Sequence, residues 1–217
     1  MGRFCVIGVG NFGYHLARNL YQAGHEVMVV DNDRGRVQRA QEVVSYALLA
    51  DAADKEFLQQ QGVAEMNAVV VSTGERGHLA TLITLYLKEI GCKRIIVKAL
   101  NDDHGTILRK VGASELVFPE KDMAAKTARS LANPNILDYL PMAEDYSISE
   151  LEPPKHFIGR SLVELDLRSR YQIMVLGIKD MLTGEFELLP PANRVIKDSD
   201  LLVMFGKTED VAKATSK

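Results

Sequence analysis

The residues from Gly8 to Gly13 have types and a spacing that suit the binding of a diphosphate. Three glycines recur as Gly-x-Gly-x-x-Gly directly after the apolar run 4–7. In such a turn the first glycine permits a tight bend, the second lets the backbone approach phosphate oxygens, and the third lets the following helix pack closely on the strand. The N-terminus of that helix offers unpaired N–H groups and a partial positive charge. The predicted contact residues are Gly8, Val9, Gly10, Asn11, Phe12 and Gly13.

An acidic residue ends the second apolar run of the chain. Val27 to Val30 is followed by Asp31, whose carboxylate can accept hydrogen bonds from a ribose 2′-hydroxyl and repels a 2′-phosphate. A strand, a glycine turn, a helix and an acid at this spacing predict a nucleotide site. The alternative is a glycine turn that binds nothing.

Further polar residues follow the other predicted strands, and ligands of open parallel sheets bind at the carboxyl ends of the strands. We therefore add to the site Asn32, Asp33, Arg36, Asp51, Ala52, Thr73, Gly74, Glu75 and Lys98. Asp51 is equally well interpreted as a helix cap, with Asp54 nearby, and Arg36 as a solvated helix charge. Lys98 is a stronger candidate, because strand ends seldom direct a lysine inward without a partner.

The elements that position these residues alternate between strand and helix over the first half of the chain. Apolar runs at 4–7, 27–30, 46–50, 68–72, 94–99 and 116–118 are separated by helical segments, among them 12–23, 54–61, 78–90 and 121–131. Near-continuous Val, Ile and Leu strands between helices indicate a parallel sheet covered on both faces. We expect an α/β Rossmann-type doubly wound domain over residues 1–132.

The remaining residues, 133–217, predict a small α+β domain on a mainly antiparallel sheet. Asn133-Pro134 breaks the helical pattern and marks the expected boundary. The predicted strands are 146–151, 173–179, 186–188 and 200–205, with one amphipathic helix over 161–170 and a last helix from Thr208.

Composition narrows the function classes. A net charge of −3 in 217 residues gives no electrostatic reason to expect nucleic acid as a partner. No apolar run approaches the ~20 residues that a membrane span needs, and the chain opens with a strand in place of a charged leader. Cys5 and Cys92 are the only cysteines, and we expect reduced thiols. Motifs of nucleophilic or zinc catalysis are absent from the sequence, so we expect a nucleotide that acts as a signal and not as a reactant. The alternatives are a small NAD-dependent oxidoreductase and a soluble nucleotide or redox sensor.

Several longer segments resemble the RCK (KTN) family, the cytosolic gating subunits of bacterial Trk/Ktr potassium uptake systems. The matching stretches cover nearly the whole chain in the single-repeat form of that family. They are GVGNFG at 8–13, GHEVMVVDND at 24–33, LLADAADKEFL at 48–58, IIVKA at 95–99, GASELVFPEKDMA at 112–124, IGRSLVELDLRSRY at 158–171 and LLPPANRVIKDSDLLVMFG at 188–206.

The resemblance implies a TrkA-N domain that binds ATP, ADP or NAD(H) and a TrkA-C domain. It implies dimers that assemble into an octameric ring, at the cytoplasmic face of the membrane, on a TrkH/KtrB-like potassium-translocating subunit. Glu120 would help to hold a divalent cation such as Mg²⁺ at the nucleotide phosphates; from the residues alone it is equally a helix N-terminal acid. A second ligand of the cyclic di-AMP type would contact Leu165, Asp166, Leu167, Arg168 and Pro191.

Two further expectations concern specificity and assembly. Members of the Ktr type commonly carry Arg at the position of Asn11, so a strong preference for ATP over ADP is not implied here and NAD(H) gains weight. The helix at 78–90 has a wide apolar face formed by Leu79, Leu82, Ile83, Tyr86 and Leu87. We expect this face to form an interface between protomers; the alternative is a helix fully covered within its own domain.

Overall fold

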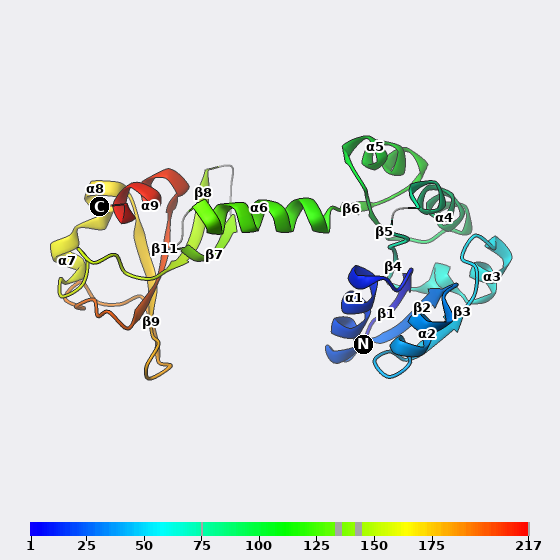
Figure 1. Cartoon of the computed structure of the whole chain (residues 1–217), viewed down its shortest axis with the longest axis horizontal. Helices are drawn as coiled ribbons and strands as arrows, with labels where there is room; N and C mark the ends of the chain where they lie inside the picture. Colours follow the sequence, from blue (N-terminus) through cyan, green and yellow to red (C-terminus); the bar gives the residue numbers. More distant parts are fainter. Residues whose placement is uncertain (75, 133–135, 142–144, 217) are drawn as a thin grey trace. The chain divides into compact units, whose positions relative to one another are not determined.

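The computed structural model describes residues 1–74, 76–132, 136–141 and 145–216. The chain divides into two compact units, Met1–Lys121 and Asp122–Lys217, which Figure 1 shows in sequence colours. The expected boundary at Asn133 lies outside the described residues, so the division at 132 stays a prediction.

The first unit is built on a six-stranded, all-parallel sheet in the order β3-β2-β1-β4-β5-β6. The order reverses between β1 and β4, which makes the topological switch point at which nucleotides bind in such folds. The expected Rossmann-type α/β sheet is thereby confirmed. The strands are β1 Arg3–Ile7, β2 Glu26–Asp31, β3 Tyr46–Leu49, β4 Ala68–Val71, β5 Ile95–Lys98 and β6 Glu115–Val117.

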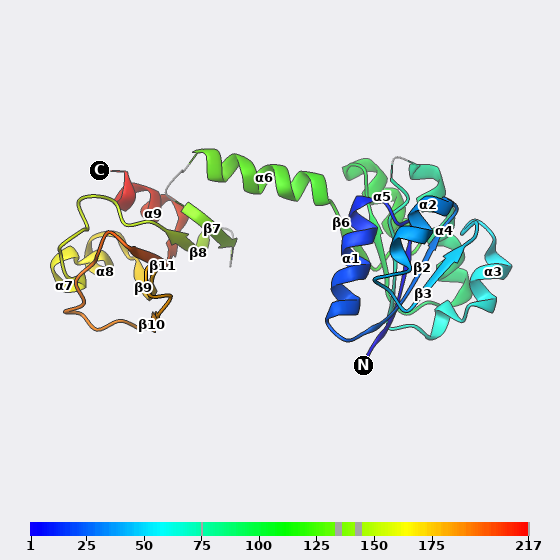
Figure 2. The ribbon, with the colours of Figure 1, turned by 60° about the horizontal axis from the view of Figure 1, so that its bottom comes forward.

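Helices cover both faces of this sheet (Figure 2). Alternate residues of a strand point to opposite faces: Val27 and Val29 of β2 pack with α1 and α2, and Val30 packs on the other side with α3, α4 and α5. The side chains of Asp33, Asp54 and Asn101 cap α2, α3 and α5. The elements are α1 Asn11–Gln22, α2 Arg34–Ala40, α3 Lys55–Gln60, the 3₁₀ helix η1 Val63–Glu65, α4 Gly77–Ile90 and α5 Asp102–Val111.

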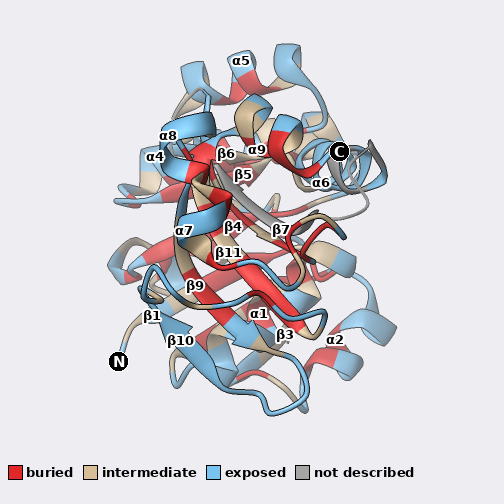
Figure 3. Ribbon diagram, turned by 90° about the vertical axis from the view of Figure 1, so that its left-hand side faces the viewer, coloured by how far each residue is buried: buried red, intermediate tan, exposed pale blue. Residues whose placement is uncertain are grey.

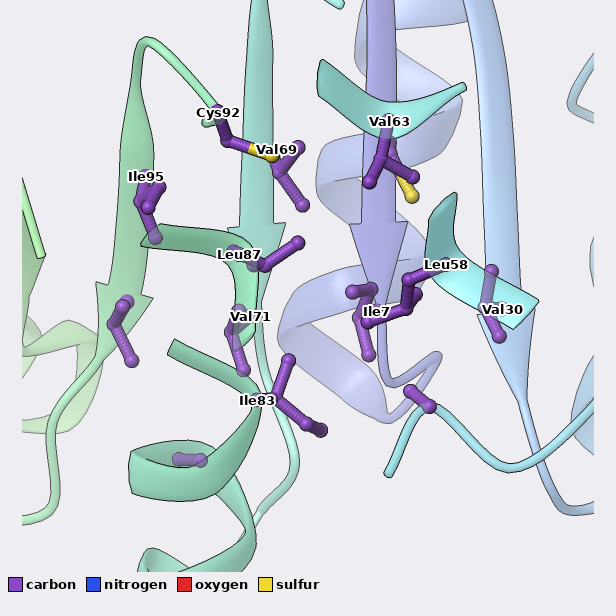
Figure 4. Packing of buried hydrophobic residues seen from close by; sticks show 14 of the residues in the cluster. Ile7, Val30, Leu58, Val63, Val69, Val71, Ile83, Leu87, Cys92 and Ile95 are labelled. Carbon is purple, nitrogen blue, oxygen red and sulfur yellow. The ribbon is translucent and has the colours of Figure 1, made fainter. Parts of the chain in front are cut away.

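Helix α4 packs one side of its apolar face into the core. Ile83 and Leu87 are fully buried and point toward Val71 and Val69 of β4 (Figure 4). Leu82 keeps 37% of its surface exposed. The sheet therefore buries only part of the wide apolar face, and its role as a protomer interface stays a prediction.

The second unit contains a five-stranded sheet in the order β10-β9-β11-β8-β7, antiparallel throughout. Its core joins strand residues such as Leu202 to residues of helices and connections such as Leu165 and Phe157; Figure 3 shows buried positions in red. The helix α6, Pro119–Ala132, carries the chain across the division between the units. The other elements are β7 Ile136–Pro141, β8 Tyr146–Leu151, α7 Leu162–Leu165, α8 Leu167–Tyr171, β9 Met174–Asp180, β10 Phe186–Leu188, β11 Asp200–Lys207 and α9 Thr208–Thr215.

The single helix expected over 161–170 is wrong, because the structure breaks it into α7 and α8 at Asp166. Asp166 adopts the left-handed conformation with φ 47° and ψ 43°. Leu165 and Leu167 are both buried in the core. Residues two apart on one helix point about 200° apart, so an unbroken helix would expose one of them. A left-handed residue, which aspartate tolerates better than most, lets both face inward.

Candidate functional site

Two neighbouring cavities lie at the carboxyl ends of the parallel strands. The first has a volume of about 430 Å³ and the second of about 480 Å³. Arg36, Ser72 and Gly74 line both, so the two form one continuous cleft. The predicted residues of the first cavity are Gly8, Asp31, Asn32, Arg36, Asp51, Ala52, Thr73 and Gly74, and those of the second are Gly10, Asn11, Phe12, Lys98 and Glu120. Val9, Gly13 and Asp33 lie beside the cleft without lining it, and Glu75 lies outside the described residues.

Each of the three glycine positions of the turn suits glycine for a different structural reason. Gly8 has φ +91°, and a Cβ there would lie 2.1 Å from the carbonyl oxygen of Ser72. A Cβ at Gly13 would lie 2.0 Å from the carbonyl oxygen of Gly8, so close packing of α1 on the turn excludes a side chain. At Gly10 no atom lies within 4 Å of the added Cβ. The space at Gly10 is therefore open, as the approach of a phosphate to the backbone requires.

The N-terminus of α1 is prepared for an anion. Gly10 is the N-cap and provides no side-chain hydrogen bond, and the first turn of α1 carries no acidic residue. The first backbone N–H groups of a helix have no partner within the helix. They face the second cavity together with Asn11 and Phe12, so this cavity suits phosphate groups.

Asp31 closes the turn from the end of β2. Its Oδ2 accepts a hydrogen bond from the N–H of Val9 at 2.6 Å, and its Oδ1 accepts one from the N–H of Asp33 at 2.9 Å. Nη1 of Arg36 lies 3.7 Å from Oδ2. The carboxylate is nearly buried, with a side-chain exposure of 4%. Because each carboxylate oxygen can accept a second bond, Asp31 can hold the glycine turn and a ribose hydroxyl together.

Of Asp51 and Asp54, the two residues considered as the cap of the following helix, Asp54 is the one that caps it. Oδ1 of Asp51 accepts a hydrogen bond from the N–H of Ala53 at 2.9 Å, and the side chain of Asp54 caps α3 through the N–H of Phe57 at 3.1 Å. Asp51 therefore shapes a turn beside the first cavity and is not the helix cap.

Lys98 and Glu120 form an ion pair on the wall of the second cavity. Lys98, at the end of β5, has a side-chain exposure of only 14%, and Glu120, in the first turn of α6, is 72% exposed. The hydrogen bond from Lys98 holds the pKa of the Glu120 carboxyl below its usual range. The cleft thus offers a cation for a phosphate and, beside it, a carboxylate.

The sequence reasoning missed Arg76, which also lines the first cavity. It occupies the N-cap position of α4, just after the strand end β4. Its position after β4 could have identified it from the sequence, by the same reasoning that identified Thr73 and Gly74.

Among the described residues, those predicted for a second ligand differ in their surroundings. The side chains of Leu165 and Leu167 pack in the core of the second unit, Asp166 is half-buried, and Arg168 and Pro191 are exposed. A cavity of about 420 Å³ in this unit is lined by other residues, among them Glu187 and Arg194. A cyclic di-AMP site therefore stays a prediction.

Within the described ranges, no group of three or more His, Cys, Asp or Glu side chains is arranged to hold a metal ion. Across the same residues, every helix is too short or too polar to traverse a lipid bilayer.

Comparison with solved structures supports the fold. The chain is similar to the GsuK RCK domain, with a TM-score of 0.67 and 20% identity over 99% of this chain and 47% of that one, so it spans about half of that relative. A GsuK channel bound to NAD gives a TM-score of 0.64 at 18% identity, over 98% of this chain and 38% of that one. The TrkA-N domain of the inner membrane protein ybaL from Escherichia coli gives 0.53 at 23% identity, over 60% of this chain and 96% of that one.

Comparison with protein families and curated proteins agrees with the expected resemblance. The TrkA-N domain matches residues 4–119, and the TrkA-C domain matches residues 147–217. Ktr system potassium uptake protein C of Bacillus subtilis is 36% identical over 97% of this chain and 94% of its own length. Ktr system potassium uptake protein A of the same organism is 35% identical over the same shares. This chain therefore belongs to the family of Ktr potassium uptake proteins built from a TrkA-N and a TrkA-C domain.

Proposed function

We propose that this chain is a nucleotide-binding regulatory subunit of a Ktr-type potassium uptake system. The observation that carries the proposal is the continuous cleft at the switch point of the parallel sheet, with the glycine turn on one side and Asp31 at its base. The family relationship indicates the transport system, and a nucleotide bound in the cleft is the proposed signal to that system.

The linings of the two cavities suit different parts of an adenine nucleotide. The first combines the apolar side chains of Leu79 and Ile83 with the carboxylates of Asp31 and Asp51, a lining that suits adenine and its ribose. The second contains the N-terminus of α1 and Lys98, which suit a diphosphate. Arg36 lines both cavities, so a single ligand passes its guanidinium.

ADP and NAD(H) fit this cleft better than ATP, whose third phosphate needs a cation of its own. Asn11 is neutral, and Lys98 is the cation that we assign to the diphosphate. Structures of the GsuK channel with NAD or ADP bound, related to this chain in fold alone, are consistent with such ligands.

The Lys98–Glu120 pair is the element through which phosphate occupancy is sensed. A phosphate that binds Lys98 competes with Glu120, and the released carboxylate is free to bind a divalent cation. Mg²⁺ commonly binds one or two carboxylates together with substrate phosphates, so the exposed Glu120 fits such a site once the phosphates are present. Glu120 lies in the first turn of α6, so this exchange acts at the helix that continues into the second unit.

Regulation requires a partner and more than one state. A ligand shifts an equilibrium only as far as its affinities for the two states differ. We assign the membrane-embedded partner to the KtrB-like class. The chain acts as a homo-oligomer, and the exposed part of the α4 apolar face supports such an interface between copies. This membrane partner places the chain at the cytoplasmic face of the membrane.

Calorimetric titration of the full chain with ADP, ATP and NADH, with and without Mg²⁺, tests the ligand assignment. Lys98→Gln should weaken binding of all three, and Glu120→Gln should remove only the effect of Mg²⁺. Lys55→Gln is the matched control, because Lys55 forms an ion pair with Glu89 at 2.7 Å away from the residues that line the cleft. Absence of binding by the wild-type chain would refute the proposal.

The transport role is tested in cells. Growth of a potassium-uptake-deficient bacterium at low potassium should require both this chain and a KtrB-like membrane subunit. Asp31→Asn should reduce that growth, and equal growth without this chain would contradict a regulatory role.

A further inference from the structure

His104 of α5 contacts two segments that are far apart in the sequence. Its Nδ1 accepts a hydrogen bond from the backbone N–H of Leu100 at 3.2 Å. Its Nε2 lies 3.1 Å from the carbonyl oxygen of Gly77 and 3.4 Å from Oγ1 of Thr81, both in α4. The backbone partners define the tautomer: the N–H of Leu100 is a donor, so Nδ1 accepts, and the neutral ring carries its proton on Nε2, where it donates to Gly77.

The region where His104 contacts Gly77 and Leu100 is closely packed. A Cβ at Gly77 would lie 3.1 Å from Cδ1 of Leu100 and 3.4 Å from Cε1 of His104. The backbone N–H of His104 donates to Oδ1 of Asn101 at 2.8 Å, which caps α5. The backbone of His104 is therefore fixed at the start of α5, while its imidazole bridges the start of α4 and the segment after β5.

Both bridged segments carry residues of the cleft. Gly74 and Arg76, just before Gly77, line the first cavity, and Lys98 and Leu100 line the second. His104 is not among the residues that line either cavity. It can therefore act on a ligand only through the positions of the two segments.

We propose that His104 is a positioning residue for the nucleotide cleft, which keeps the start of α4 and the segment after β5 at the separation that a ligand spanning both cavities needs. This inference rests on the proposed function and adds a residue that sets the geometry of the same site. When a binding-competent arrangement is populated only in part, the apparent affinity falls by that fraction. Loss of one neutral hydrogen bond then corresponds to roughly fivefold to tenfold weaker binding.

Two substitutions separate the two contacts of the ring. Asparagine places an acceptor oxygen near the position of Nδ1 and keeps the contact to Leu100, and glutamine places an amide nitrogen near the position of Nε2 and keeps the contact to Gly77. If the bridge itself matters, neither amide rescues binding. His25 is the matched control, because its Nδ1 accepts the N–H of Gly2 at the same 3.2 Å at the amino ends of the strands, away from the cleft.

Calorimetry with NADH and hydrogen exchange read by mass spectrometry, both on the full chain, test the proposal. His104→Asn and His104→Gln should each bind NADH about fivefold to tenfold more weakly, whereas His25→Gln should bind like the wild type. Exchange in the segment 99–101 should accelerate in His104→Gln, which loses the acceptor for Leu100, more than in His104→Asn. This difference reports on the bridge and not on general stability.

The outcomes distinguish the two proposals. If the wild-type chain binds NADH and both His104 variants bind it with unchanged affinity, the positioning role is wrong and the proposed function stands. If the wild-type chain binds no adenine nucleotide, both fail. Should a variant not fold, exchange of the wild-type chain decides: NADH must slow exchange in 99–101 and 77–81 together, and slowing in one segment alone overturns the bridge.

Discussion

Replacement of Asp31 by asparagine tests the residue on which the nucleotide site depends most. The carboxylate accepts backbone N–H groups from Val9 at 2.6 Å and Asp33 at 2.9 Å, and it is 4% exposed. Asparagine has the same shape but only one acceptor oxygen, so its amide group would oppose one of the two N–H donors. A hydrogen bond to a charged group contributes about 1.5–3 kcal/mol, so we expect Asp31→Asn to lower the free energy of unfolding of the first unit by about this amount. The ion pair with the half-exposed Arg36 adds little.

The same substitution should weaken nucleotide binding by a free energy similar to the loss of folding stability. The ribose hydroxyl loses its charged acceptor and the glycine turn loses one of its two anchors. We expect affinity for ADP and NADH to fall by about tenfold to a hundredfold, since 1.4 kcal/mol corresponds to tenfold. Calorimetry measures the affinity, and urea unfolding followed by far-ultraviolet circular dichroism measures stability, because the chain contains no tryptophan.

Asp33→Asn is the matched control. Asp33 caps α2 through the N–H of Arg36 at 3.0 Å, and asparagine is an equally good cap. Both its stability and its affinity should remain near those of the wild type. Unchanged unfolding of Asp31→Asn would show that the two backbone bonds contribute no net stability, and unchanged affinity would show that Asp31 does not hold the ribose.

Other consequences follow from the core and from titrating groups. Leu87→Ala should lower the free energy of unfolding of the first unit by about 2–5 kcal/mol, measured by urea unfolding, because Leu87 is fully buried. Burial raises the pKa of the Cys5 thiol to about 12 and that of Cys92 to about 11, so at pH 8 a colorimetric thiol reagent should react with both only after unfolding; rapid labelling of the native chain would contradict this. Hydrogen bonds from Ser161 hold the pKa of the Glu164 carboxyl below its ordinary 4.5. The contribution of the ionised Glu164 to folding stability is therefore complete above pH 4.5 and is lost as the pH falls through the lowered pKa. Glu164→Gln should reduce the loss of stability in acid, as equilibrium unfolding between pH 3 and pH 6 would record.

The break at Asp166 shows where a local pattern misleads. The segment 161–170 has amphipathic spacing, and Ser161 and Glu164 form a capping box that starts a helix. Propensity and spacing therefore agreed on one helix. The core required Leu165 and Leu167 on the same side, and burial of both side chains outweighs one left-handed residue.

The strand 136–141 was also not anticipated, and the helix 34–40 entered only as the alternative interpretation of Arg36. The sequence of β7 contains Pro141 and the charged Asp138, and β7 is an edge strand of its sheet. Edge positions accept residues that a central strand excludes, so the pattern there is weak. Helix α2 has seven residues, too few for a clear period.

The glycine turn and its acid were readable in the chain because each requirement is local. Gly8 must take a positive φ and Gly13 must let a helix touch the preceding turn, and no other residue type meets these demands at that spacing. Asp31 follows its strand directly, so its place at the carboxyl end of the sheet needed only the identification of the strand.

The partnerships across the cleft arise from the order of the strands. Lys98 meets Glu120 because β5 and β6 are neighbouring strands, and His104 joins Leu100 to Gly77 because α4 and α5 pack side by side. Such pairs combine residues from separate helices and loops whose spacing in the chain carries no signal. Residue type and local periodicity account for the strands, the turn and the acid, whereas the ion pair, the bridging histidine and the left-handed Asp166 follow from packing, which sums contacts over the whole fold.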